Sequence, residues 1–132
     1  MRKVLFLLIF PLISISCEKD EPPTSLEMLE GKWVIDSMEI LAQVVPGDGS
    51  YLEFNACSSN CTGEDYRESD MSTGNFTYDL SADASTISII DTLDAGGNYN
   101  ATWDILELTE EDFRIVGNTI LGSLKIEMSK TN

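Results

Sequence analysis

Histidine is absent from the 132 residues, and basic residues are few, since 8 Lys and Arg stand against 23 Asp and Glu. Without imidazole, a Ser-His-Asp or Cys-His nucleophile is impossible, and so is a zinc or iron site ligated by histidine. The formal net charge of −15 repels a phosphate backbone, which makes nucleic acid a poor partner. The length allows one domain, and a hydrophobic content of 42% is typical of a globular protein.

Long apolar runs are also scarce, and the longest lies at the N-terminus. Two basic residues precede an apolar stretch over 4–15, which is too short for a membrane-spanning helix of about 20 residues. Residues 1–16 therefore predict a secretory signal peptide. Ser16 precedes Cys17, and a strongly polar stretch follows. This arrangement resembles the lipobox of bacterial lipoproteins, in which the cysteine is acylated and becomes the new N-terminus. The alternative is ordinary signal-peptide cleavage with Cys17 as a bystander.

The residues after the cysteine suggest where the protein is displayed. In one phylum of Gram-negative bacteria, a lysine and two acids after the lipidated cysteine mark lipoproteins for the outer surface. Lys19, Asp20 and Glu21 resemble that export signal. The alternative is a solvated acidic tether, because residues 17–25 contain two prolines and four charges and favour a semi-extended spacer. We predict an outer-membrane lipoprotein, exposed at the cell surface and held to the membrane by its N-terminal lipid.

Only 3 cysteines are present. With Cys17 lipidated, Cys57 and Cys61 remain, and in an exported protein they are expected to form a disulfide. A metal site needs two more soft ligands, which the chain lacks, and C-x₃-C is not the spacing of thiol oxidoreductases. We therefore predict a structural bridge, which shapes the loop beyond the second strand.

Alternation of apolar and polar residues dominates the predicted domain, residues 26–132. Thr24 and Glu27 stand at capping-box spacing and predict a short helical turn over 26–30. Period-two alternation then predicts half-buried strands. The expected strands cover 32–41, 51–56, 75–80, 86–90, 100–108, 113–115 and 124–128. No run is left for a crossover helix, so we predict an all-β fold, an antiparallel up-and-down barrel of about eight strands.

A family resemblance begins at the first of these strands. Gly31 and Trp33, after a helical turn, resemble the Gly-x-Trp signature of lipocalins. The segments 101–108 and 110–115, followed by a last alternating strand, look like the small lipocalin-like domains of bacterial surface lipoproteins. The resemblance implies that Trp33 packs into the closed end of the barrel. In classical members an arginine covers this Trp, and Arg114 is the candidate for that role.

Four further aromatic residues are candidates for lining a ligand cavity: Phe54, Phe76, Tyr78 and Trp103. Large aromatic side chains inside a small barrel more often form the core, because eight strands leave little more room than side chains fill. A mixed arrangement also fits the pattern, with the barrel packed at the Trp33 end and open at the other.

Three acidic clusters, at 64–65, 91–94 and 110–112, raise a calcium hypothesis, but none has the residue order of an EF-hand loop. We interpret them as turn residues and solvated charge, and we predict no metal site and no cofactor. The tripeptide from Asp91 to Leu93 resembles an acceptor of protein O-glycosylation in the same bacterial group. This makes Thr92 a candidate for modification.

These observations favour a binding module that is not an enzyme. A small apolar ligand would enter the open end, or a protein partner would meet the rim loops. The alternative is a structural or accessory subunit of a surface lipoprotein complex, with a fully packed barrel and no ligand. An apolar opening of ~300 Å³ or more favours a ligand. A filled interior with an exposed apolar patch favours a partner.

Overall fold

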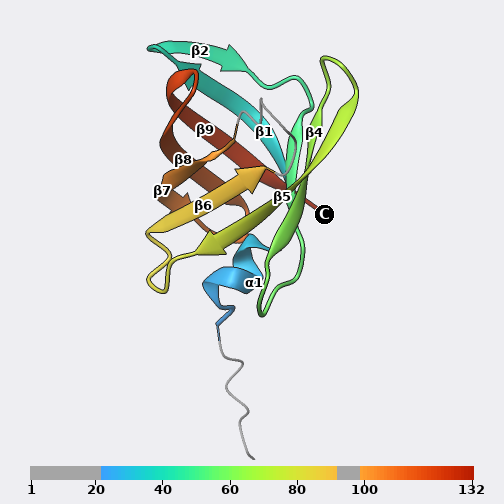
Figure 1. Cartoon of the computed structure of the whole chain (residues 1–132), viewed down its shortest axis with the longest axis vertical. Coiled ribbons are helices and arrows are strands. Elements are labelled where there is room, and N and C mark those ends of the chain that lie inside the picture. The colour runs from blue at the N-terminus through green and yellow to red at the C-terminus, as the bar shows by residue number, and fades with distance from the viewer. Residues whose placement is uncertain (1–21, 92–98) are drawn as a thin grey trace, which may run out of the picture.

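The structure, a computed structural model, describes residues 22–91 and 99–132. A short helix, α1 (Ser25–Leu29), precedes an antiparallel sheet of nine strands. The strands are β1 (Gly31–Ile40), β2 (Gln43–Pro46), β3 (Tyr51–Phe54), β4 (Thr62–Arg67), β5 (Ser72–Leu80), β6 (Thr86–Asp91), β7 (Ala101–Leu108), β8 (Asp112–Thr119) and β9 (Gly122–Thr131). Because β1 also pairs with β9, strands β1 and β3–β9 close into a barrel (Figure 1). The predicted all-β antiparallel barrel, preceded by a helical turn, is confirmed.

The helix forms where the capping pattern predicts it. Thr24 Oγ1 accepts a hydrogen bond from Glu27 N at 3.3 Å, and Glu27 Oε2 accepts one from Thr24 N at 2.7 Å. Gly31 has a φ of 120°, which a side chain would disfavour, and there the chain turns from α1 into β1. This turn allows Trp33 Nε1 to donate a hydrogen bond to the Leu29 carbonyl at 2.7 Å.

Alternation does not predict β2 and β4. The β2 strand pairs with the second half of β1, whereas β3 pairs with the first half on the same edge. The β1–β2 hairpin therefore extends beyond the barrel, where all four β2 residues are exposed. In β4 the alternate positions on one face hold Gly63, Asp65 and Arg67 rather than apolar residues. Because its inward residues are not apolar, this strand lacks the alternation of apolar and polar residues that predicts a strand.

The up-and-down topology sorts the connections into two ends (Figure 1). The lower end holds α1 and the β3–β4, β5–β6 and β7–β8 connections. The upper end holds the β1–β2 hairpin, the β4–β5 turn and the β8–β9 turn. Within the described residues, no helix has the length and hydrophobicity needed to cross a membrane.

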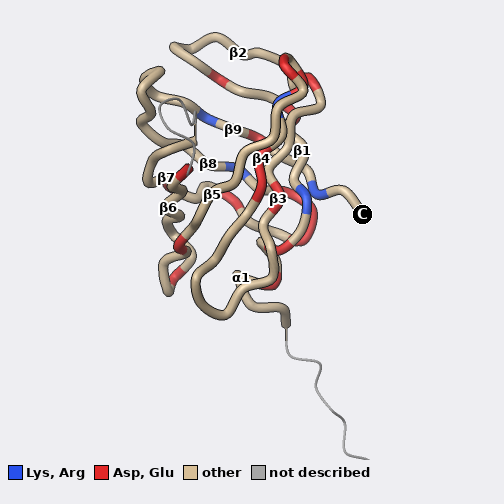
Figure 2. Tube along the Cα trace, turned by 45° about the vertical axis from the view of Figure 1, so that its right-hand side comes forward, with Lys and Arg blue, Asp and Glu red and all other residues tan. Residues whose placement is uncertain are grey.

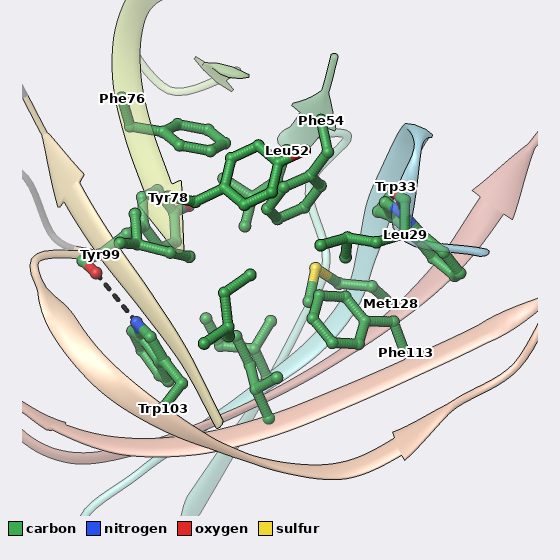
Figure 3. Close-up of a cluster of buried hydrophobic side chains, with 14 of the residues drawn as sticks. Leu29, Trp33, Leu52, Phe54, Phe76, Tyr78, Tyr99, Trp103, Phe113 and Met128 are labelled. Carbon is green, nitrogen blue, oxygen red and sulfur yellow. Dashed lines mark hydrogen bonds between the residues drawn. The ribbon is translucent and has the colours of Figure 1, made fainter. Parts of the chain in front are cut away.

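Apolar side chains fill the barrel along its axis (Figure 3). Phe54 lies at the centre of the aromatic part, with its ring centroid 5.0 Å from Tyr78, 5.3 Å from Phe76 and 6.0 Å from Phe113. Much of the remaining interior is aliphatic, with Ile87, Ile89, Ile115, Leu124 and Ile126 all buried. Dense packing of this kind leaves little internal space.

Candidate functional site

The lower end is sealed around Trp33. Its ring is fully buried and lies 5.4 Å from the ring of Phe113, as the Gly-x-Trp resemblance implies. Lys130 covers it, with Nζ 5.0 Å from the indole ring, and the same Nζ donates to the Met28 carbonyl at 2.7 Å. The expectation that Arg114 has this role is wrong, because Arg114 Nε instead donates to Glu107 at 2.6 Å across β7 and β8.

Cys57 and Cys61 form the predicted disulfide in the β3–β4 connection, with their Cα atoms 5.2 Å apart. Tyr78 holds this connection against β5, since its backbone N–H donates to the Cys61 carbonyl at 3.0 Å and its hydroxyl to the Asn55 carbonyl at 2.9 Å. A groove of about 510 Å³ lies between this loop, β5 and Leu26. The disulfide therefore orders a loop at the sealed end.

The four aromatic candidates for cavity lining are buried in the core. Phe54, Phe76 and Tyr78 pack against one another, and their side chains point toward the barrel axis in Figure 3. Trp103 is fully buried and donates its indole N–H to the Tyr99 carbonyl at 2.9 Å. Their packing agrees with the interpretation that these aromatic residues form the core.

Large apolar side chains are exposed at the upper end. We define the apolar rim as Leu41, Val44, Val45, Ile120 and Leu121, which are between 47% and 79% exposed. Pairing of β1 with β9 as far as Ile40 and Leu124 brings the two hairpin tips together. A methyl group at Gly122 would lie 3.6 Å from Leu41 Cδ2, so the two tips are in contact range. The exposed apolar side chains of the two hairpins therefore lie at the same end of the barrel, and exposed apolar side chains gathered in this way can mark an interaction site.

Acidic residues lie on the upper loops beside the apolar rim. Figure 2 shows many acidic and few basic residues, with acids on the upper loops. Asp48 accepts hydrogen bonds from the hydroxyl and the backbone N–H of Ser50 at 2.6 and 3.0 Å, which lowers the pKa of Asp48. Asp70 is held in the same way by Ser72, and its pKa is lowered too. These two loops therefore keep their negative charge at neutral pH.

A polar cluster lies in the upper interior. Asp65 on β4 is 1% exposed, Asp91 at the end of β6 is 9% exposed, and Tyr99 is buried beside them. Burial raises the pKa of Asp65, and the nearby charge of Asp91 adds to the effect. Burial, reinforced by Asp65, also raises the pKa of Tyr99. The interpretation of these two acids as solvated charge is wrong, because both side chains face into the barrel.

A small pocket adjoins this cluster under β2. Its volume is about 180 Å³, and Ile35, Met38 and Val45 form much of its apolar wall. Arg67 and Tyr99 line its polar side. Pockets for drug-sized ligands usually begin near ~300 Å³, so this one suits a smaller molecule. A wider hollow of about 550 Å³, beside Pro22, Met28 and Leu108, is a shallow groove at the lower end.

Several predicted sites lie outside the described residues: Cys17, Lys19, Asp20, Glu21 and Thr92. Their predicted lipidation, export and glycosylation stay predictions. Within residues 22–91 and 99–132, no group of three Cys, Asp or Glu side chains is placed to hold a metal ion.

Comparison with known proteins agrees with the fold. A family model for a lipocalin-like domain matches residues 29–115. Among solved structures, a redesigned β-barrel is similar, with a TM-score of 0.54 and 15% identity over 82% of this chain and 96% of that chain. At this identity the likeness concerns the fold alone. No curated protein sequence matches the chain. Because the family model spans well over half of its residues, the chain belongs to the lipocalin-like domain family.

Proposed function

We propose that this protein is a lipid-anchored surface module that binds a partner protein at the apolar rim. The observation that carries the proposal is the exposed apolar rim on a barrel whose interior is filled. Lipocalin-like folds are typically binding folds without catalysis, which agrees with this role. A drug-sized apolar ligand is less well supported, because the pocket under β2 measures only about 180 Å³ and the two larger grooves, of about 510 and 550 Å³, are open to solvent at the lower end.

The lipid anchor would orient the barrel relative to the membrane. In the proposal, Cys17 carries the lipid, and Lys19, Asp20 and Glu21 direct export to the outer surface. Residues 22–24 lead into α1 at the lower end, whereas the apolar rim lies at the opposite end (Figure 1). An anchored barrel would therefore hold its apolar rim away from the membrane, within reach of a partner.

The acidic residues near the apolar rim indicate that the partner's surface is basic. Glu39, Asp48, Glu68 and Asp70 belong to the segments that form the upper end. Lys125, on the neighbouring part of β9, is already paired with Glu127 at 3.2 Å. A partner surface with an apolar centre and surrounding Lys and Arg complements this arrangement. A second copy of the chain fits poorly, because each copy carries a formal charge of −15.

Site-specific photo-cross-linking on intact host cells tests the proposal. Cross-linkers replace Leu41 and Ile120 on the apolar rim, and Leu106 on the barrel wall is the matched exposed control. Both rim positions should capture the same polypeptide, and Leu106 should not. The purified pair should bind at least about tenfold more weakly with Leu41→Ser/Ile120→Ser and should weaken with added salt. Equal capture from Leu106, or capture only of a second copy, contradicts the proposal.

The anchor has its own test. Cells that express the intact chain or Cys17→Ala are labelled with a radioactive fatty acid. Label should enter the intact protein and be lost in the variant, because only a cysteine at this position can be acylated. Incorporation that survives the substitution rules out the anchor and leaves the cross-linking result unaffected.

A further inference from the structure

The apolar rim includes both valines of β2, and β2 has a free edge. This strand pairs with β1, and within residues 22–91 and 99–132 no strand pairs with its other edge. All four residues of β2 are exposed, and none of them is charged. The edge of a sheet carries backbone donors and acceptors, and an extended segment of another chain can pair with them.

The register of the β1–β2 hairpin shows which backbone groups point to the free edge. Gly47 N donates to the Asp36 carbonyl at 2.7 Å, so these two residues form a hydrogen-bonded pair. Antiparallel pairs alternate in type along the ladder, which makes Glu39 and Val44 a non-hydrogen-bonded pair. The N–H and the carbonyl of Val44 therefore point away from β1. Because Pro46 has no N–H, Val44 supplies the donor that β2 presents at this edge.

One face of β2 carries Val45 and borders the pocket of about 180 Å³. Ile35 and Met38 form part of its apolar wall, and Arg67 and Asp48 are among the polar residues that line it. The opposite charges of Arg67 and Asp48 favour neither a basic nor an acidic side chain. An apolar side chain from a segment paired with β2 is the best fit for this pocket.

The opposite face of β2 carries Val44 and borders a pocket of about 190 Å³. Lys125 and Glu127 line this pocket and pair with each other at 3.2 Å. Glu39 also lines it and has no ion pair among the described residues. The negative charge of Glu39 favours a basic side chain on this face.

We propose that the partner adds an extended segment to the free edge of β2, with apolar and basic side chains in alternation. This inference rests on the proposed function and names the kind of segment that the apolar rim binds. The Val44 N–H donates to a carbonyl of the segment, the apolar side chains enter the pocket beside Val45, and the basic side chains lie over Val44 toward Glu39. A second copy of β2 is a poor substitute, because it carries no basic residue.

The test uses the purified full chain and two peptides of equal composition with blocked ends. One peptide alternates, Lys-Val-Lys-Val-Lys-Val-Lys, and the other, Lys-Lys-Val-Val-Val-Lys-Lys, does not. The amide NMR signal of Val44 should shift and saturate with the alternating peptide at millimolar concentration. Binding of the second peptide should be at least about tenfold weaker. Equal binding of the two peptides would show charge attraction alone and overturn the proposal, as would the absence of a saturable shift.

A variant pair separates the backbone of Val44 from its side chain. Val44→Pro removes the N–H at the free edge but keeps an apolar side chain, and it should weaken binding of the alternating peptide at least about tenfold. Val44→Ala keeps the N–H and should weaken binding less. Equal losses in the two variants, or undiminished binding by Val44→Pro, contradict the strand pairing. The comparison of the two peptides needs no variant, so it decides the question even if Val44→Pro fails to fold.

Failure of the strand pairing is distinguishable from failure of the proposed function. If Leu41 and Ile120 capture a partner whose binding is unchanged by Val44→Pro, the partner meets the apolar rim through side chains alone and only the strand pairing fails. If the alternating peptide binds as expected but neither rim position captures a partner on cells, the strand pairing stands and the proposed function fails.

Discussion

The lower end of the barrel is closed by α1, a disulfide and a cluster of aromatic rings, whereas the upper end combines a polar interior with exposed apolar hairpin tips. The same hydrogen bond occurs twice, since Trp33 and Trp103 each donate an indole N–H to the backbone carbonyl four residues earlier. Their surroundings differ. Trp33 lies against Phe113 under Lys130, whereas Trp103 faces Gly117 across β7 and β8.

The lower end of the barrel contributes most to stability, and the upper end carries the features that are typical of a binding site. Burial of large apolar side chains supplies most of the stability of a fold, and the rings of Trp33, Phe54 and Phe113 pack together at the lower end. The upper part therefore tolerates features that add little stability, such as an Asp65 Oδ1 atom without a hydrogen-bond partner among the described residues and an exposed Leu41. Features of this kind are typical of binding sites.

Opening the sealed end should cause the largest loss in the free energy of unfolding. Trp33→Ala removes a fully buried ring and should lower the free energy of unfolding by about 3–5 kcal/mol. Denaturant unfolding followed by circular dichroism measures the loss. Leu106→Ala, at an exposed wall position, should change it by no more than about 0.5 kcal/mol. If both variants lose similar amounts, Trp33 does not hold the lower end together.

Removal of the disulfide should cause a smaller loss in the free energy of unfolding. Cys57→Ser/Cys61→Ser releases the constraint on a very short loop and should cost about 2 kcal/mol in the chain-entropy estimate. The wild-type protein in reductant should unfold at the same denaturant concentration as the double variant. Methyl signals of Met38, at the upper pocket, should not move. A shift there would mean that the two ends are not independent.

Sequence reasoning predicted the sealed end better than the upper end. The positions of Gly31, Trp33 and the capping box lie in patterns that local chemistry dictates. Alternation predicted seven strands because their inward positions are apolar. It missed β2, which is exposed on both faces, and β4, whose inward face holds Gly63, Asp65 and Arg67.

The candidate site was missed for the same reason. An Asp beside a Glu in a polar segment is usually solvated, so the sequence alone favours surface charge at residues 64–65. Only the closure of the barrel, with β4 between β3 and β5, turns Asp65 inward. The identity of the cation that covers Trp33 also depends on tertiary structure, because Lys130 reaches Trp33 only when β9 pairs with β1.

The smallest change in stability concerns Asp65 and is expected to be a gain. Burial and the nearby Asp91 raise the pKa of Asp65 above its ordinary 3.8, so the folded state holds this proton more tightly than the unfolded state. The stability that Asp65 contributes therefore falls as pH rises from its ordinary pKa through the raised value. Arg67 opposes this effect, and the nearby charge of Glu64 adds to it.

Asp65→Asn should consequently be more stable than the wild type at neutral pH, by about 1 kcal/mol, because a buried charge without a full set of donors is removed. The advantage should shrink as pH falls below the raised pKa, since the wild-type carboxyl is then neutral in the fold as well. Denaturant unfolding at a series of pH values measures the difference, with Asp79→Asn as the exposed control. A wild type that is more stable at neutral pH would mean that attraction to Arg67 exceeds the cost of burial. Asp65 would then be part of a structural ion pair, and the two ends of the barrel would differ less than their side chains indicate.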